Sequence, residues 1–415
     1  MKRTLVLGIA LMAMVAFSAY AQQNCPESDF RVAPVDGGRS VRIVEYVGNN
    51  WTVRIPPQIR NLPVTHIGED AFRERTIIGV TIPNTVTHIE RAAFFNNQLT
   101  NVTIPNSVIY IGRSAFHTNL LTSITIPNSV ISIGLGAFYG NTNLQSVNFA
   151  PGSRLERIYG PTRDANDRNW IGRGAFQGTA LTNITIPRGV TYIGNMAFFG
   201  NQLTRASLPS SVTHIGRSAF ANNSLTNVSL PDSVTHIRQW AFRNNQLATI
   251  TIPARLSSMG VGVFRDNPLT NVTFSAGVTT IVDEAFSYTQ LTSIVIPDTI
   301  THIGFNAFFE SHLTSITIPS SVTSIGDGAF AGAHLTRVTF ASRGVSFQPF
   351  SFAIPQRAIS PSALMEAFSG RGGMQAGSIG GATFASGNLA QVYAREGAGT
   401  YLRDPGSLSW IRSRL

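Results

Sequence analysis

The sequence is poor in two residue types, and each shortage restricts what the protein can be. Cys25 is the only cysteine and Lys2 the only lysine among 415 residues. A single cysteine excludes an intramolecular disulfide, so packing and hydrogen bonds must hold the fold. Cys25 is either the lipidated residue of a lipoprotein or an unpaired thiol, and the polar residues 22–24 before it favour the thiol.

Long hydrophobic runs are also missing beyond the first residues. Lys2 and Arg3 precede an apolar run from Leu5 to Phe17, and Ala19-Tyr20-Ala21 has the small-x-small pattern of a cleavage site. The run is shorter than the roughly 20 residues that cross a bilayer. We interpret residues 1–21 as a signal peptide and expect an exported protein without a transmembrane segment. We expect it to be extracellular or associated with the cell surface or outer membrane, and the periplasm is the alternative.

Known catalytic and nucleotide-binding patterns are absent. The sequence has no GxSxG, no HExxH and no phosphate-binding glycine loop. The stretch "DANDRN" (164–169) begins like a calcium loop, but its fifth position is Arg168 and its twelfth is Ala175 instead of glutamate. We therefore expect no enzyme activity, no cofactor and no bound metal.

Positive charge comes almost entirely from arginine. Lys+Arg number 31 against 21 Asp+Glu, which gives a net charge of +10. Guanidinium groups bind sulfates and carboxylates bidentately, so one interpretation is a surface for anionic polymers. The other is scattered surface charge, which the lack of a dense arginine run favours. An export signal argues against nucleic acid as the partner.

What the sequence has in abundance is one phrase of 22 residues, as in "LTSITIPNSVISIGLGAFYGN" (121–141). A fixed period of this size predicts a solenoid in which each copy forms one coil. Phenylalanine holds one place in twelve copies, 22 residues apart except for a 38-residue step after Phe138, and we expect it to form the core. These residues are Phe72, Phe94, Phe116, Phe138, Phe176, Phe198, Phe220, Phe242, Phe264, Phe286, Phe308 and Phe330.

Each copy predicts two extended pieces and a turn. Ile124 and Ile126 alternate with polar residues, which is typical of a half-buried strand that Pro127 ends. Residues 128–133 predict a second, shorter extended piece. The stretch before each phenylalanine predicts a brief helical turn, whose start Glu69-Asp70 and Asp283-Glu284 would favour. Asparagines at the final corner are expected to bond backbone groups; they are Asn97, Asn119, Asn201, Asn223, Asn245 and Asn267.

The pattern "LTSITIPNSV…SIG..AF" resembles the BspA-type leucine-rich repeat of exported, often surface-located proteins of host-associated bacteria and some protists. The resemblance covers about Trp51 to Phe340, and the ending "GTY-x-R…W" (399–410) resembles spirochaete members. It implies a mainly β solenoid of about twelve coils with a main parallel sheet, capped at both ends. It also implies a role in adhesion or host-protein binding, without binding residues to carry over.

The ends of the chain predict further segments. Residues 22–50 form an N-terminal cap, in which "VRIVEYVGNNWTVRIP" predicts a hairpin through Gly48-Asn49-Asn50. The solenoid spans 51–340, and 341–359 form a C-terminal cap closed by Phe347, Phe350 and Phe352. The Gly-rich tail 360–415, with helices expected at 362–368 and 388–395, is a cap, a sorting element or a partly ordered tail.

Two departures from the repeat are candidates for ligand binding, because a few large anchors usually carry affinity. One is the insertion loop 158–170, and the other is "IRQWAF" (237–242); we expect them about 20 Å apart along the stack. The candidate residues are Tyr159, Arg163, Arg168, Trp170, Arg238 and Trp240. A neutral insertion is the alternative for the loop.

Two polar columns complete the pattern. His66, His88, His214, His236 and His302 share one place in the repeat, but two neighbouring imidazoles are too few for a zinc site. The outward residues of the long strands are mostly Thr, Ser and Asn, without the acids that a polymer-degrading enzyme would need.

The sequence therefore predicts an exported, monomeric interaction protein. It would bind a host or extracellular-matrix protein or glycan over an extended surface. A passive structural or antigenically variable surface protein is the alternative, and a polymer-degrading enzyme is the third.

Overall fold

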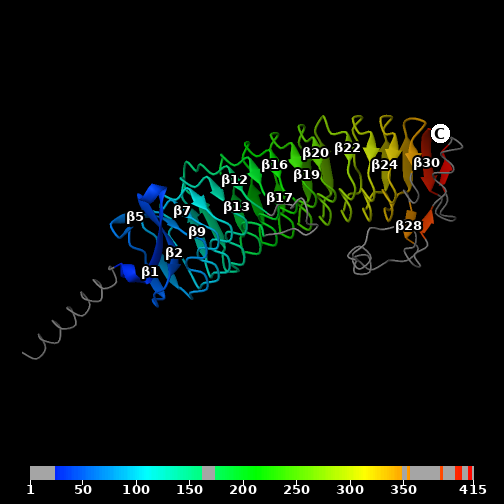
Figure 1. Cartoon of the computed structure of the whole chain (residues 1–415). Helices are drawn as coiled ribbons and strands as arrows, with labels where there is room; N and C mark the ends of the chain where they lie inside the picture. Colours follow the sequence, from blue (N-terminus) through cyan, green and yellow to red (C-terminus); the bar gives the residue numbers. More distant parts are fainter. Residues whose placement is uncertain are drawn as a thin grey trace, which may run out of the picture. The chain divides into compact units, whose positions relative to one another are not determined.

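The computed structural model describes residues 24–160, 173–347, 353–355, 384–386, 398–403 and 410–413 (Figure 1). The chain divides into two units, Met1–Leu181 (unit 1) and Thr182–Leu415 (unit 2), and each is described by itself. Both are built from parallel β-coils. Within the described ranges, the helical segments are η1 (Glu27–Asp29) and η2 (Asp36–Gly38), both 3-10 turns. The predicted mainly β repeat solenoid is confirmed.

Each coil consists of a long strand, a corner, a short strand and a turn. In one coil of unit 1, β9 (Ser123–Ile126) alternates exposed and buried residues. Its two isoleucines are at most 2% exposed, because neighbouring side chains of a strand point to opposite faces. Val130 then points into the core, and β10 (Ser132–Ile133) leads to the phenylalanine turn. The predicted order of extended pieces is correct.

In unit 1 the short strands form one continuous ladder. Its members are β2 (Ser40–Tyr46), β5 (Leu62–Ile67), β7 (His88–Ile89), β8 (Tyr110–Ile111), β10 and β12 (Arg157–Ile158), all paired in parallel. The long strands pair as β3 (Thr52–Arg54) with β6 (Gly79–Thr81) and β9 with β11 (Ser146–Phe149). The two-residue β4 (Gln58–Ile59) pairs antiparallel with β5.

In unit 2 the short strands form two ladders instead of one. The first contains β14 (Tyr192–Ile193), β16 (His214–Ile215), β18 (His236–Ile237) and β20 (Ser258–Met259); the second contains β22 (Thr280–Ile281), β23 (His302–Ile303), β25 (Ser324–Ile325) and β27 (Ser346–Phe347). The long strands are β13 (Asn183–Thr185), β15 (Arg205–Ser207) and β17 (Asn227–Val228), then β19 (Thr249–Ile252) with β21 (Asn271–Phe274), then β24 (Ser315–Ile318) with β26 (Arg337–Phe340).

The twelve repeat phenylalanines form the core column, as predicted. Each is at most 1% exposed. Within each unit the ring of one coil stacks on the next, with centroids 5.0 Å apart for Phe72 and Phe94 and 6.0 Å apart for Phe264 and Phe286. Coils are named below by their column phenylalanine. Burial of this column stabilises each coil through its neighbours, as is usual in solenoids.

The turn around each phenylalanine is not helical, so the prediction of a brief helical turn was wrong. The second residue before and the second residue after the phenylalanine both adopt positive φ, as with Ser114 (54°) and Thr118 (52°) around Phe116. Asp70 and Glu284 occupy the first of these places, at 56° and 55°. A left-handed residue interrupts a helix, so these acids do not start one.

The corner asparagines behave as predicted. Asn245 is buried; its side-chain oxygen accepts the N–H of Leu225, and its amide donates to the carbonyls of Phe220 and Phe242. Asn119 and Asn267 make the same bonds in their own coils. One side chain thus satisfies buried backbone groups of two neighbouring coils.

The N-terminal hairpin lies elsewhere than predicted. β1 (Phe30–Val35) pairs antiparallel with β2 through Asp36–Gly38, whereas β3 joins β6 in a parallel ladder. The expected hairpin through Gly48–Asn50 therefore does not form, because β3 already belongs to the first long-strand ladder. Cys25 is buried beside it, and its sulfur accepts the N–H of Arg54 at 3.4 Å.

Part of the tail adds strands to the last coil of unit 2. β30 (Gly399–Arg403) pairs antiparallel with β26 and with β31 (Trp410–Arg412), and Tyr401 is fully buried against Phe340. β28 (Ala353–Pro355) pairs with β29 (Phe384–Ser386). The predicted tail helices, as well as Phe350 and Phe352, lie outside the described residues.

Candidate ligand-binding surface

The structure describes only half of the predicted site residues. Arg163, Arg168 and Trp170 of the insertion loop lie outside the described ranges. Tyr159 is half-buried in unit 1, where its backbone N–H donates to the carbonyl of Ile133 at 3.0 Å. Arg238 and Trp240 belong to unit 2 and are described below.

Arg238 and Trp240 face different neighbours although only one residue separates them. Arg238 is exposed; burial lowers the pKa of His214, and the charges of His236 and Arg238 add to this effect. The Trp240 ring instead lies under the guanidinium of Arg217, whose central carbon is 4.4 Å from the ring centroid. The sequence analysis missed Arg217, which is three residues before Phe220, in the coil preceding Trp240.

The backbone at Trp240 shows that this placement has a conformational cost. Trp240 adopts φ +58°, a left-handed conformation that costs a bulky residue on the order of 1–2 kcal/mol. The next coil has Gly262 in the same place, and a Cβ there would lie 2.6 Å from the indole Cδ1. Glycine therefore leaves the space that the indole fills. A strained residue with a fitted neighbour is a candidate functional feature.

Unit 1 carries a longer stack of the same kind. The rings of Phe95, His117 and Tyr139, each directly after a column phenylalanine, stack at 4.6 and 4.7 Å. Arg73 lies over Phe95 at 4.6 Å and Arg173 over Tyr139 at 4.9 Å, so guanidinium groups cover both ends. Phe95, His117 and Tyr139 are half-buried. The sequence could have shown this stack, because comparing the residue directly after each column phenylalanine gives three rings in successive coils.

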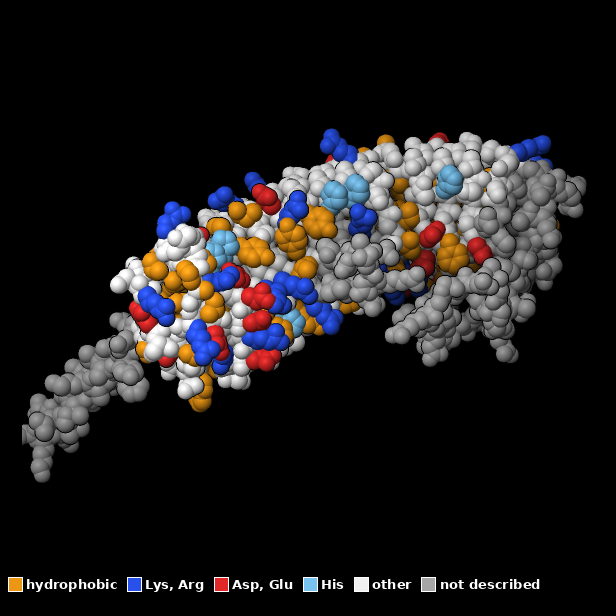
Figure 2. Space-filling model, viewed as in Figure 1, with side chains coloured by type: hydrophobic (Ala, Val, Ile, Leu, Met, Phe, Trp, Pro, Cys, Tyr) orange, Lys and Arg blue, Asp and Glu red, His pale blue; other side chains and the backbone are white. Residues whose placement is uncertain are grey.

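We call these side chains the arginine–aromatic face of each unit. In unit 1 it consists of Arg73, Phe95, His117, Tyr139 and Arg173, and in unit 2, taken by itself, of Arg217 and Trp240. Figure 2 shows basic, acidic and hydrophobic side chains gathered over the part of unit 1 drawn in blue and cyan in Figure 1. Burial, with a smaller effect of Arg173, lowers the pKa of His117 to about 4. His117 is therefore neutral at neutral pH and stacks as an uncharged ring.

The histidine column is organised by threonines. Thr87 donates its hydroxyl hydrogen to the carbonyl of Thr65, and the same oxygen lies 2.9 Å from Nδ1 of His88. Because the Thr87 hydroxyl has no second hydrogen to donate, its oxygen must accept from His88. We therefore place the imidazole hydrogen on Nδ1 of His88, which leaves Nε2 as an acceptor. His66 and His88 stack at 4.4 Å, as do His214 and His236. Among the described residues, no three His, Cys, Asp or Glu side chains are grouped as metal ligands.

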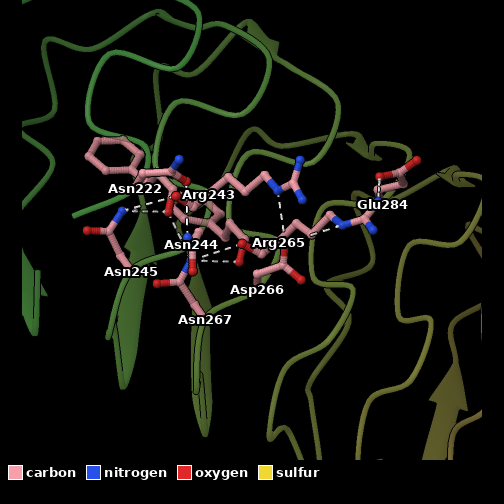
Figure 3. A network of polar contacts seen from close by, with 10 residues as sticks. Asn222, Arg243, Asn244, Asn245, Arg265, Asp266, Asn267 and Glu284 are labelled. Carbon is pink, nitrogen blue, oxygen red and sulfur yellow. Dashed lines mark hydrogen bonds and ion pairs between the residues drawn. The ribbon is translucent and has the colours of Figure 1, made fainter. Parts of the chain in front are cut away.

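A polar cluster joins three successive turns of unit 2 (Figure 3). Arg243 Nε binds Asp266 Oδ2 at 2.9 Å, and Arg265 forms an ion pair with Glu284 and covers the Tyr288 ring at 5.0 Å. The side chains of Arg265 and Glu284 are only 17% and 18% exposed. We call these five residues the turn clamp, because they connect the Phe242, Phe264 and Phe286 coils at their turns.

No described helix is long and apolar enough to cross a bilayer. The outward residues of the described long strands are mostly polar. Val295 is 83% exposed and lies in the segment of the Phe308 coil that corresponds to the long strand in other coils.

These features place the protein in a known class of repeat protein. A BspA type leucine rich repeat region matches in six copies over residues 65–159, 169–292 and 279–360, which is more than half of the chain. The chain therefore belongs to the BspA-type leucine-rich repeat family.

Solved structures of bacterial repeat proteins have a similar fold. A leucine-rich repeat protein of Bacteroides ovatus is 21% identical with a TM-score of 0.56, over 78% of this chain and 88% of that one. The pneumococcal vaccine antigen PcpA is 18% identical with a TM-score of 0.52, over 80% of this chain and 90% of that one. No curated protein sequence matches this chain.

Proposed function

We propose that the protein is exported and binds a host or extracellular-matrix macromolecule, protein or glycan, through the arginine–aromatic face. The leader 1–21 supports export, and membership of the repeat family supports an interaction role. One similar structure is described as a vaccine antigen. Mature protein that still begins at Met1 would contradict export.

The observation that carries the proposal is the geometry of Trp240. Its left-handed backbone is a conformation that glycine adopts without strain, and glycine does occupy the same place in the Phe138, Phe264 and Phe330 coils. A tryptophan kept there against this cost, and fitted under Arg217, favours a role in recognition. Tryptophan and arginine are also the side chains most enriched at binding hot spots.

The stacked arginines define the chemistry of the ligand. A guanidinium held over a ring loses less conformational freedom when it binds than a free arginine does. Its edge can donate hydrogens to carboxylate or sulfate oxygens, as Arg73 already does to Asp70 and Glu74 of this chain. The face therefore suits acidic glycans or acidic protein segments. The loop 158–170 adds Arg163, Arg168 and Trp170 to this proposal.

The test is a pull-down from host-cell extract with the mature protein, followed by titration of the strongest retained component. We expect Trp240→Gly to weaken binding at least tenfold without lowering the melting temperature, because glycine suits φ +58°. Replacing 158–170 by a Gly-Ser link should weaken binding further. Val295→Ser is the matched control, because Val295 is exposed in unit 2 but is not part of the face.

Two results would contradict the proposal. If Val295→Ser weakened binding and Trp240→Gly did not, recognition would belong to the long-strand surface. If the mature protein retained no host component above an unrelated solenoid, the passive surface protein would be the better account.

A further inference from the structure

Unit 2 contains an open groove of about 760 Å³ where its two short-strand ladders separate. The Phe264 and Phe286 coils meet there, and we call their junction the open joint. Figure 2 shows hydrophobic and acidic side chains near one another over this part of unit 2. The apolar walls are Met259, Val261, Val282, Ile303, Phe305 and Ile325.

The groove exists because hydrogen bonds around the short strands of the two coils, β20 and β22, are missing. At the next junction, Thr301 N–H donates to Thr279 and Gly304 N–H to Ile281, at 2.8 and 2.7 Å. At the open joint, no described acceptor lies in reach of the corresponding N–H groups of Thr279 and Val282. The coils remain joined along their long strands, where β19 pairs with β21, and at their turns. There the turn clamp and the bond from Gly262 N–H to Asp283 O, 2.9 Å long, connect them.

Val282 and Thr289 together account for the separation. Val282 lies directly after the short strand, four residues before the column phenylalanine, and we call this place the glycine corner. The next coils have Gly304 and Gly326 there, where a Cβ would lie 2.5 Å from Asp283 N and 2.6 Å from Phe305 N. A side chain at this place crowds the backbone of the preceding coil, although Arg238 is accommodated there in a coil that keeps its corner asparagine, Asn245. Thr289 replaces the corner asparagine in the same coil, and its hydroxyl bonds only the carbonyl of Phe286 within that coil. The Phe286 coil thus loses both links to the coil before it.

The groove differs in charge from the rest of the chain. Asp283, Phe305 and Asp327 follow one another in a single column of successive coils, so the carboxylates stand about 10 Å apart with the ring between them. Phe305 is 36% exposed, and no lysine or arginine lines the groove. Four of the other coils have an arginine in this column (Arg91, Arg113, Arg173 and Arg217), and one has an acid, Glu69.

Asp327 lacks part of its hydrogen bonding. Its Oδ1 is buried without a partner among the described residues, and burial raises the pKa of Asp327. Asp283 Oδ1 accepts the N–H of Phe305 at 2.8 Å. A donor with positive charge would satisfy Asp327 and meet the second carboxylate within the same groove.

We propose that this groove binds an extended peptide segment with an arginine beside an apolar residue. The guanidinium lies on Phe305 between Asp283 and Asp327, where cation–π attraction and two carboxylates favour it. The apolar side chain enters the gap between Val261 and Val282. The free N–H groups of Thr279 and Val282 donate hydrogen bonds to the peptide carbonyls, as in strand addition. This site is separate from the arginine–aromatic face, and the proposal does not depend on the function proposed above.

The test is a fluorescence anisotropy titration of the full mature protein with a labelled acetyl-Ile-Arg-Ile-amide probe. We expect saturable binding, and binding at least tenfold weaker for the same peptide with glutamine in place of arginine. Asp283→Asn, Asp327→Asn and Phe305→Ser should each weaken binding several-fold. Val282→Gly should weaken it by closing the gap. Asp298→Asn is the control: it removes an exposed charge of the Phe308 coil, which also contains Phe305. Asp298 does not line the groove, so binding should be unchanged.

Three outcomes would overturn the proposal. One is a wild-type protein that does not bind the probe, as would follow if another part of this chain filled the groove. The second is an equal loss for Asp298→Asn and Asp327→Asn, which would show that net charge alone matters. The third is equal affinity for the arginine and glutamine probes. Melting curves for each variant separate a lost site from a lost fold.

Discussion

Two neighbouring junctions in unit 2 share the Phe286 coil and differ in how they are held together. At the junction with the Phe308 coil, β22 pairs with β23 and Gly304 occupies the corner. At the open joint, β20 and β22 belong to separate ladders and Val282 occupies the corner. The ring centroids are 5.7 Å apart at the first junction and 6.0 Å at the second.

The comparison shows that two replacements, at the glycine corner and at the corner asparagine, are needed to open a junction. Neither junction has the corner asparagine, since Thr289 and Ser311 stand in its place, yet only one is open. Loss of the corner asparagine alone is therefore not sufficient to open a junction. Arg238 fills the corner of the Phe242 coil, where Asn245 is retained and β16 pairs with β18, so a non-glycine corner is not sufficient either. In unit 2 the joint opens where both links are lost.

One coil of unit 1 limits this rule. The Phe176 coil has Tyr159 at the corner and Thr179 in place of asparagine, but β10 still pairs with β12. Its insertion follows directly, so the chain need not return to the phenylalanine within 22 residues. The Phe286 coil has no insertion at this place, so the two coils differ in chain length as well as in the corner residue.

The largest expected effect is on the free energy of unfolding, when a core phenylalanine at either junction is replaced by alanine. Phe308→Ala should lower the free energy of unfolding by about 3–5 kcal/mol, because the ring is fully buried between Phe286 and Phe330. Phe264→Ala should cost about 1 kcal/mol less, because the open joint can collapse around the cavity. Urea unfolding of both variants is the measurement, and equal costs would count against looser packing at the open joint.

The next effect comes from opening the closed junction. Gly304→Val should cost about 1–3 kcal/mol, because the new Cβ would meet Asp283 N at 2.5 Å. The matched variant is Gly200→Ala, where nothing lies within 4 Å of the new Cβ and only the positive φ of 66° is strained. Chemical denaturation should show the larger loss for Gly304→Val; the reverse order would mean that corner crowding is not limiting.

A pH effect tests the aromatic links of unit 1. The pKa of His117 is about 4 in the folded protein and about 6.5 in an unfolded chain. Between these values the unfolded chain binds the proton more readily, so stability is full above pH 6.5 and falls as the pH drops toward 4. After allowance for partial exposure we expect a loss of about 1 kcal/mol. His117→Asn should remove this part of the pH dependence of the melting temperature; an unchanged profile would assign it to other groups.

The smallest effect concerns the turn clamp. Glu284→Gln weakens the pair with Arg265 and should cost about 0.5–1 kcal/mol, since both side chains are largely shielded from water. Asp298→Asn, an exposed change in the next coil, the Phe308 coil, is the control. If thermal melts of the two variants agreed within error, the clamp would not contribute to stability.

The repeating parts of the fold could be predicted from the sequence because the same local physics acts in every copy. The phenylalanine core, the long strands and the corner asparagines follow from alternation, period and residue type. The turns were mistaken for helical ones because positive φ at Ser114 or Trp240 is imposed by coil stacking, not by those residues. The hairpin was misplaced because the pairing of β3 with β6 competes for the same segment.

The candidate sites were less accessible to sequence reasoning. Trp240 could be singled out as a departure from the repeat, but its contact with Arg217 depends on which places meet across coils. The open joint depends on two replacements, Val282 and Thr289. Each kind of replacement also occurs alone in other coils, so neither of them predicts an open joint from the sequence. The space that a Cβ would need at the corner becomes visible only in the stacked structure.

Hydrogen exchange resolved to single amides tests the central claim most directly, because it compares the two junctions in one protein. The account predicts that the N–H groups of Thr279 and Val282 exchange rapidly, while those of Thr301 and Gly304, which are bonded at 2.8 and 2.7 Å, are protected. In the Val282→Gly, Thr289→Asn double variant, Thr279 should become protected as well. Equal protection of Thr279 and Thr301 in the unaltered protein would contradict the open joint and the groove built on it.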